Sequence, residues 1–259
     1  MPKFAANLSF LFTESPFPER FQKAADAGFH GVEYLFPYAW PAAEIAGWLA
    51  SAGLEQVLFN LPAGDWAAGE RGLACLPQRQ CEFAESVERA LHYAVLLDCP
   101  RVHCLAGLCP VGYAEAELEA TYIANLRHAA DRLASIGATV MIEPINSRVD
   151  MPGYWLDDMA KAFRLLEAVD RSNVKLQYDV YHAQIIAGDL VRTLSAHIER
   201  IGHIQIADNP GRHEPGTGEI NYPFLFEHLD RLGYAGWVGC EYHPSTTTAA
   251  SLGWLSAAK

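Results

Sequence analysis

The feature that most constrains this chain is an alternation of short apolar runs with longer segments of helical periodicity, which repeats eight times. Short runs rich in β-branched and apolar residues predict strands, and the longer segments between them predict helices. Strands that alternate with helices form parallel sheets built from strand-helix-strand units. The sequence therefore predicts an α/β fold with a parallel sheet.

The eight units leave little room for anything else in the chain. Eight units in 259 residues give about 32 residues each, and no Pro-, Gly- or Ser-rich linker divides them. We predict a single (β/α)8 TIM barrel over residues 1–259, with an open doubly wound sheet as the alternative. The predicted strands are Phe4–Asn7, Gly31–Tyr34, Gln56–Asn60, Arg101–Leu105, Thr139–Glu143, Val174–Asp179, His203–Ala207 and Trp237–Glu241. The predicted helices are approximately Pro18–Ala27, Ala42–Ala52, Gln80–Leu97, Ala114–Ile136, Leu156–Val169, Leu190–Arg200, Tyr222–Leu232 and Thr247–Trp254.

Charge limits the classes of partner. The formal net charge is −12 at pH 7, whereas nucleic-acid binding depends on clustered Lys and Arg, so we expect no nucleic-acid partner. The same charge repels anionic substrates at long range, so a substrate carboxylate must be met by a local cation. No apolar run approaches the roughly 18 residues of a membrane-spanning helix.

The first residues show no secretory signal pattern, so we expect a cytoplasmic protein that acts on a small molecule. The six cysteines form no Cys-x-x-Cys pair, and free thiols are expected. Barrels of this size often form homo-oligomers through exposed helices or loops, and the sequence leaves the oligomeric state open.

Polar residues end four consecutive strands of the predicted barrel. Catalytic groups of such barrels lie at the C-terminal ends of the strands, and Glu143, Asp179, Gln205 and Glu241 all fall there, separated by 36, 26 and 36 residues. Each acidic residue alone could instead face solvent or cap the following helix. Four on consecutive strands favour a shared site, and an all-oxygen set of this kind favours Mg²⁺ or Mn²⁺ over Zn²⁺.

Two histidines lie close to these positions. His182 follows Asp179 in Tyr-Asp-Val-Tyr-His, and we expect it to face the same opening and contact substrate or metal, although a structural role is the alternative. His203 lies two residues before Gln205 on the same strand face, one layer deeper. We interpret His203 as a packed core histidine.

Two loops are longer and richer in glycine than a connector needs. Residues 60–72, which begin with Asn60, carry Trp66 and Arg71, and residues 207–219 carry Arg212. Long loops at the catalytic rim commonly bind substrate or close over it. Either arginine could bind a substrate carboxylate through two parallel hydrogen bonds, and we expect Asn60, Arg71, His182 and Arg212 to contact the substrate.

Six stretches of the chain resemble the hydroxypyruvate isomerase family, within the xylose-isomerase-like barrels that include the tagatose and psicose epimerases. They are residues 6–9, 60–72, 142–146, 206–210, 214–222 and 237–242, among them Ile-Glu-Pro-Ile-Asn and Trp-Val-Gly-Cys-Glu-Tyr. The resemblance implies that Glu143 and Glu241 are the catalytic pair, which interconverts hydroxypyruvate and 2-hydroxy-3-oxopropanoate. Isomerisation would pass through an enediolate, and a hydride shift between the carbons is the alternative.

Through the related epimerases, the resemblance implies that Glu143, Asp179, Gln205 and Glu241 bind a divalent metal. Those epimerases usually carry His where this chain has Gln205, which leaves the metal's identity and affinity open. A close relative in the family isomerises 2-oxo-tetronates, and a ketose 3-epimerase is a further alternative. The third-strand loop and Ile-Glu-Pro-Ile-Asn favour hydroxypyruvate.

Two other classes use a similar barrel. A metal-dependent apurinic endonuclease would need several His ligands and a basic groove for DNA, which the charge of −12 disfavours. A non-catalytic sugar-acid binding protein would keep the barrel without turnover. The presence of both Glu143 and Glu241 disfavours the second class.

Overall fold

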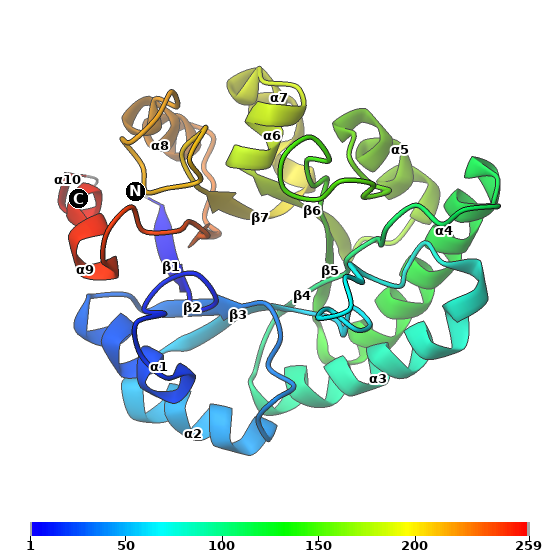
Figure 1. Cartoon of the computed structure of the whole chain (residues 1–259), viewed down its shortest axis with the longest axis horizontal. Helices are drawn as coiled ribbons and strands as arrows, with labels where there is room; N and C mark the ends of the chain where they lie inside the picture. Colours follow the sequence, from blue (N-terminus) through cyan, green and yellow to red (C-terminus); the bar gives the residue numbers. More distant parts are fainter. Residues whose placement is uncertain (1, 258–259) are drawn as a thin grey trace.

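The computed structural model describes residues 2–257 and shows eight parallel strands closed into a barrel in chain order. Figure 1 shows the helices arranged around the outside of this barrel. Each strand pairs with its neighbours in sequence, and β1 closes the ring by pairing with β8. The predicted (β/α)8 architecture is therefore confirmed. The strands are β1 Lys3–Asn7, β2 Gly31–Tyr34, β3 Glu55–Asn60, β4 Arg101–His103, β5 Thr139–Ile142, β6 Val174–Asp179, β7 Ile201–Ile206 and β8 Trp237–Cys240.

The outer helices bury their apolar faces against the strands. In α1, for example, Phe21 and Ala24 are buried while Gln22 and Lys23 between them face solvent. The strands are buried on both faces because the helices cover the outside and side chains fill the interior. The helices are α1 Phe17–Asp26, α2 Ala42–Ala52, α3 Gln80–Leu96, α4 Glu115–Leu133, α5 Met159–Val169, α6 Val180–Ile186, α7 Leu190–His197, α8 Tyr222–Arg231, α9 Thr248–Ser251 and α10 Gly253–Ala257, with short 3-10 turns at Pro77–Arg79, Ala134–Ile136 and Ile198–Arg200.

The structure corrects several of the predicted boundaries, and three of the corrections have a clear local reason. Helix α6 begins directly after β6, and sequence reasoning missed it because it is short and shares its first residues with the site. Helix α5 begins three residues later than predicted, because the Asp158 side chain caps it by accepting from the Lys161 backbone N–H. Strands β5 and β8 end one residue before Glu143 and Glu241, so both glutamates begin loops rather than end strands.

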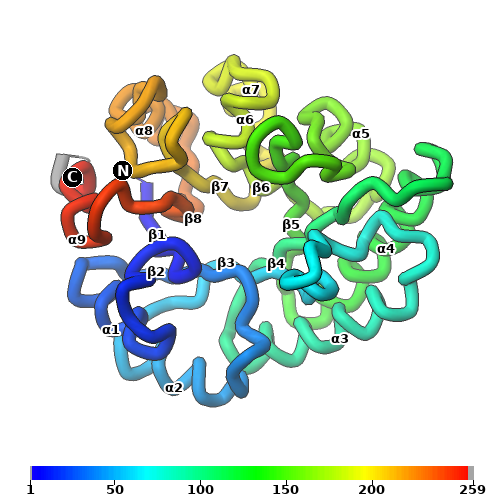
Figure 2. Tube along the Cα trace, viewed as in Figure 1, coloured from blue at the N-terminus to red at the C-terminus, as the bar shows by residue number. Residues whose placement is uncertain are grey.

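The two ends of the described chain lie beside each other. Figure 2 shows the last helices next to the start of the chain. The Phe12 backbone N–H donates to the Thr248 hydroxyl at 2.7 Å, and Glu14 accepts from the Thr248 backbone N–H at 2.7 Å. These bonds fix the loop after β1 against the segment after β8, so both contribute to the same rim of the barrel. No helix among residues 2–257 is long and apolar enough to cross a membrane.

Candidate active site

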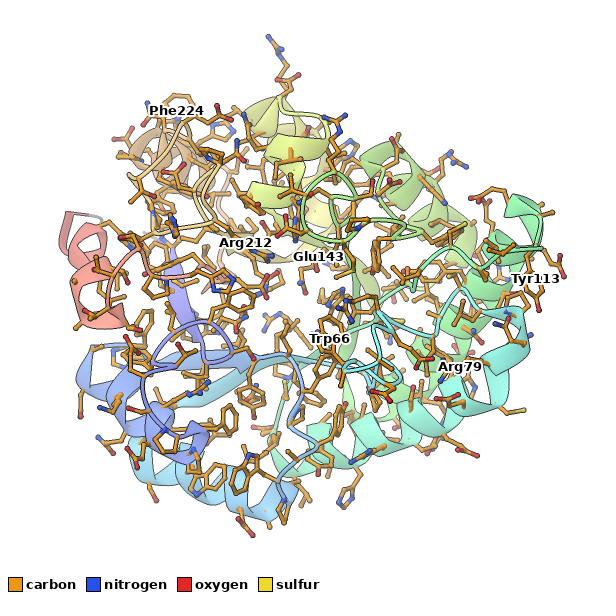
Figure 3. All side chains as sticks on the ribbon, in the orientation of Figure 1. Trp66, Arg79, Tyr113, Glu143, Arg212 and Phe224 are labelled. Atoms are coloured by element: carbon orange, nitrogen blue, oxygen red, sulfur yellow. The ribbon has the colours of Figure 1, made fainter. Side chains whose placement is uncertain are left out.

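The four predicted strand-end residues lie buried at the C-terminal mouth of the barrel. Asp179 and Gln205 end or nearly end β6 and β7, and Glu143 and Glu241 follow β5 and β8. Each is at most 5% exposed. Figure 3 shows Glu143 and Arg212 close to the barrel axis, whereas the labelled Tyr113 and Phe224 lie at the periphery. The structure thus brings the predicted carboxyl groups together at one point.

A chain of amide side chains connects the two glutamates across the barrel. The Gln177 side-chain N–H groups donate to Glu143 Oε2 at 2.9 Å and to Gln205 Oε1 at 2.6 Å. Gln205 Nε2 in turn lies 3.3 Å from Glu241 Oε1. Because these groups are at most 5% exposed, water competes little for the bonds and each carboxyl is held in one orientation. Sequence reasoning did not identify Gln177, although an amide inside an otherwise apolar strand is a usable signal.

Glu33 on β2 is a further buried carboxyl that sequence reasoning missed. It lies 2.6 Å from His203 Nε2 and accepts from Gln205 at 2.7 Å and from Asn7 at 3.0 Å. Gly239 on β8 gives it room, because a Cβ there would lie 2.3 Å from Glu33 Oε1. Asn7 also donates to Glu241 Oε1 at 3.0 Å, so this layer supports the site from below. His203 is 0% exposed, which confirms its interpretation as a core histidine.

Arg212 places a cation beside these carboxyl groups. Its Nη2 donates to Glu241 Oε2 at 2.8 Å and its Nη1 donates to Asp150 Oδ1 at 2.9 Å. The guanidinium carbon lies 5.0 Å from the Phe10 ring centre and 5.2 Å from the Tyr181 ring centre. Two carboxylates at its edge and aromatic rings beside it fix the plane of the group.

The loop that carries Arg212 is built around one buried carboxylate. Asp208, 1% exposed, accepts four backbone N–H bonds, at 2.9 to 3.1 Å, from Asn209, Gly216, Gly218 and Ile220. The Arg212 backbone has φ +53°, a left-handed conformation that is uncommon outside glycine. Its carbonyl accepts from the His243 backbone N–H at 2.9 Å, which ties this loop to the one after β8. The loop is therefore rigidly placed over the site.

His182 reaches the site from the first turn of α6. The Asn146 side-chain oxygen accepts two backbone N–H bonds from the turn that follows it, so its amide nitrogen faces His182 Nδ1 at 2.7 Å. Burial and the charge of Arg212 lower the pKa of His182 well below its usual value, so the ring is neutral. With Nδ1 accepting, the proton resides on Nε2. That N–H lies 3.9 Å from an oxygen of Glu143 and from an oxygen of Asp179.

Asp179 caps the following helix with one carboxyl oxygen and presents the other to the site. Its Oδ1 caps α6 by accepting from the Tyr181 and His182 backbone N–H groups at 2.7 and 3.1 Å. Its Oδ2 is buried and has no hydrogen-bond partner among residues 2–257, and the same holds for Glu143 Oε1. Glu143, Asp179 and His182 each present one atom within 4.8 Å of the others, an arrangement that could hold a metal ion. The two orphaned carboxyl oxygens are the better donors, because His182 Nε2 carries a proton.

The carboxyl groups of the site have unusual proton affinities. Burial raises the pKa of Glu143 well above its ordinary value, and the charges of Asp179 and Glu241 raise it further. Burial also raises the pKa of Glu241 to about 8 and that of Asp179 to about 6, although Arg212 opposes both shifts. Carboxyl groups that exchange protons near neutral pH are suited to general acid-base chemistry.

The other two residues expected to contact substrate lie elsewhere in the mouth. Arg71 stacks over the Trp66 ring at 4.1 Å and donates to the backbone oxygens of Trp66 and Glu70 at 3.1 and 2.7 Å. It therefore stabilises its own loop. Asn60 ends β3, is 2% exposed, and its backbone oxygen accepts from the Tyr38 hydroxyl at 2.7 Å. Neither side chain bonds to Glu143 or Glu241.

Comparisons with known proteins agree on one family. The sequence pattern of the xylose isomerase-like TIM barrel family matches residues 21–258. A 2-oxo-tetronate isomerase of Cupriavidus necator is 52% identical over 255 residues, and a hydroxypyruvate isomerase of Escherichia coli is 49% identical over 255 residues; each alignment covers 98% of both chains. A crystal structure described as AP endonuclease, family 2, from Brucella melitensis is 51% identical, with a TM-score of 0.97 and 99% of both chains covered.

Proposed function

Because the chain belongs to the xylose isomerase-like TIM barrel family and its full-length relatives are isomerases, we propose that this isomerase interconverts hydroxypyruvate and 2-hydroxy-3-oxopropanoate. The observation that carries the proposal is the pair of buried carboxyl groups, Glu143 and Glu241, joined by one hydrogen-bonded chain and accompanied by a partly buried arginine, Arg212. This arrangement provides two proton-transfer groups and one carboxylate-binding cation at the mouth of the barrel.

The reaction moves one proton between adjacent carbons and one between their oxygens. In hydroxypyruvate, one proton leaves C3 and gives an enediolate, and a proton is then added to C2. The hydroxyl oxygen on C3 loses its proton while the former ketone oxygen on C2 gains one, so atoms and electrons balance. We assign the two carbon-proton transfers to Glu143 and Glu241, each of which should contribute about 10²- to 10⁴-fold to the rate.

The neighbouring donors suit the rest of the substrate. Arg212 uses one N–H of Nη1 and one of Nη2 for Asp150 and Glu241, which leaves further N–H groups for the substrate carboxylate. The N–H on His182 Nε2 can donate to an oxygen on which negative charge develops in the enediolate. His182 is buried and the Arg212 side chain is only 15% exposed, so their hydrogen bonds form in a poorly hydrated environment where they are stronger.

A divalent cation, Mg²⁺ or Mn²⁺, fits the two orphaned oxygens of Glu143 and Asp179. Gln205 and Glu241 would complete the ligand set, although their oxygens already accept hydrogen bonds from Gln177 and Arg212. When bound, the cation would supply Lewis-acid polarisation of the substrate oxygens.

The four-carbon 2-oxo-tetronates are the second candidate substrate, because relatives that carry that name are as similar to this chain as the hydroxypyruvate isomerase. They present the same carboxylate and the same neighbouring oxygens to the site. The Brucella protein raises an AP endonuclease as a different class. A chain of net charge −12, whose site arginine is already bound by Asp150 and Glu241, does not favour a phosphate backbone.

The test is to incubate the purified protein with hydroxypyruvate in D₂O, with and without EDTA, and to follow the aldehyde product and carbon-bound deuterium by proton NMR. We expect turnover with deuterium incorporation, and a loss of at least about 100-fold in Glu143→Gln and in Glu241→Gln. Near-normal rates in both variants would overturn the assignment. Turnover without deuterium would favour a hydride shift, and turnover that survives EDTA would overturn the metal proposal. Turnover of a 2-oxo-tetronate alone would identify the second substrate.

A further inference from the structure

Asp150, in the loop between β5 and α5, connects three groups at the mouth of the barrel. Its Oδ1 accepts from Arg212 at 2.9 Å, and its Oδ2 accepts from the Asn146 amide at 2.7 Å and the Tyr181 hydroxyl at 3.0 Å. The donors come from the loops after β7 and β5 and from α6. Three hydrogen bonds on two oxygens hold the carboxylate in a single orientation.

This carboxylate fixes the position of Arg212. An arginine on a mobile loop loses side-chain freedom when it binds a ligand, which weakens binding. Here the guanidinium is already held at one edge by Asp150 and at the other by Glu241, and it lies near the rings of Phe10 and Tyr181. The conformational cost is therefore met before a substrate arrives. Glu241 has its own proposed chemical role, so Asp150 is the contact available for orientation alone.

The same carboxylate acts on the other substrate-facing donor through Asn146. The Asn146 side-chain nitrogen lies between Asp150 Oδ2 and His182 Nδ1, at 2.7 Å from each. Holding this amide in place keeps the proton of His182 on Nε2, directed toward Glu143 and Asp179. One aspartate thus supports both the cation for the substrate carboxylate and the N–H for the reacting oxygens.

We propose that Asp150 is a positioning residue of this enzyme, which orients Arg212 toward the carboxylate of a small oxo-acid substrate and, through Asn146, orients His182 toward its reacting oxygens. Asp150 itself touches no reacting atom. The inference rests on the proposed function because it assumes a substrate with a carboxylate. It predicts that loss of Asp150 weakens carboxylate binding more than it slows the chemical step.

The test measures KM and kcat for hydroxypyruvate and, independently of turnover, the affinity for D-glycerate by calorimetry. Asp150→Asn should raise KM and the D-glycerate Kd about tenfold, the loss typical of one charge-assisted hydrogen bond, while kcat changes less than about threefold. Tyr181→Phe keeps the ring near Arg212 and removes one donor to Asp150, so it should shift both constants in the same direction by a smaller factor.

The matched control is Asp157→Asn. Asp157 lies in the same loop, is also partly buried, and accepts from the Ser147 hydroxyl at 2.5 Å without a recorded contact to Arg212. The Asp157→Asn substitution should leave KM and the D-glycerate affinity within about twofold of wild type. Unchanged KM and Kd in Asp150→Asn, or equal losses in both aspartate variants, would overturn the proposal. A wild-type enzyme that binds D-glycerate without turning over hydroxypyruvate would refute the proposed function. The D-glycerate affinities of the variants would still test the role of Asp150.

Discussion

The loops of residues 60–72 and 207–219 look alike in sequence, yet the structure uses them in different ways. Each is long, follows a strand at the barrel mouth and carries one arginine that could bind a carboxylate. Arg212 lies between Glu241 and Asp150 in the buried site, whereas Arg71 stacks on Trp66 and donates to backbone oxygens of its own loop. The presence of an arginine in a loop at the barrel mouth therefore does not by itself predict that its side chain lies in the site.

The loops also differ in how their backbones are supported. The first places glycines, Gly64, Gly69 and Gly72, at its left-handed positions, where the lack of a Cβ makes the conformation easy. The second places Arg212 itself in a left-handed conformation at φ +53°. Such strain persists only where the surroundings enforce it, and it is common at functional sites. The difference indicates that the second loop is shaped for its side chain.

The largest expected effect separates the two arginines. Arg212→Ala removes the cation between buried Glu241 and partly buried Asp150, and we expect kcat/KM for hydroxypyruvate to fall by about 100- to 1,000-fold. Arg71→Ala removes a cation stacked on an aromatic ring within its own loop, and we expect less than about a threefold change. Steady-state kinetics on both variants checks this, with circular dichroism to confirm folding. Equal losses would mean that Arg71 also reaches the substrate.

A smaller effect is expected from the residues that hold each loop. Asp208→Ala leaves four backbone N–H groups without their buried acceptor, and we expect Tm to fall by roughly 5 to 10 °C and kcat/KM by about tenfold. Glu70 anchors the first loop through the Asp65 backbone N–H and Arg79, but its side chain is 34% exposed. Glu70→Ala should therefore change Tm by less than about 2 °C. Thermal unfolding of both variants would contradict this comparison if Glu70→Ala proved the more damaging.

The sequence predicted best what depends on periodicity. The shared rim position of Glu143, Asp179, Gln205 and Glu241 follows from the eightfold repeat, because parallel strands of a closed barrel bring their C-terminal ends to one rim. The length of the loops was also readable. Their internal conformation was not, because Arg71 bonds within its own loop whereas the partners of Arg212, Asp150 and Glu241, lie 62 and 29 residues away.

Polar residues inside strands were the main omission. Glu33 sits in a run that reads as an ordinary buried strand, and its partners His203 and Gln205 are 170 and 172 residues away. A buried carboxyl requires partners, so a glutamate in such a run is itself evidence of a polar interior. Asp150 gave no such signal, since a single acidic residue in a loop is most often solvated. Only the folded arrangement shows that it contacts Arg212.

The smallest effect concerns how acidic residues beside each loop respond to pH. Hydrogen bonds from Arg79 and from the Asp65 backbone lower the pKa of Glu70, so its stabilisation is complete above its ordinary value of 4.5 and is lost as pH falls through its folded pKa. Burial raises the pKa of Glu241 from 4.5 to about 8. The folded protein then holds a proton that the unfolded chain releases, so stability falls as pH rises from about 4.5 to 8.

Between pH 6.5 and 8, the loss of stability caused by the raised pKa of Glu241 can be measured separately. Burial lowers the pKa of His103 to about 3 and that of His182 well below 6.5, so both raise stability with pH only up to about 6.5. In EDTA, we expect the wild-type Tm to fall by a few degrees across the window. Glu241→Gln should make Tm depend less on pH, and the remaining dependence should come from Glu143. Glu70→Gln should show the same dependence of Tm on pH as the wild type. Parallel slopes in all three proteins would mean that Arg212 keeps Glu241 ionised at every pH tested. The Arg212–Glu241 pair would then be a permanent ion pair, as Arg79–Glu70 is beside the first loop.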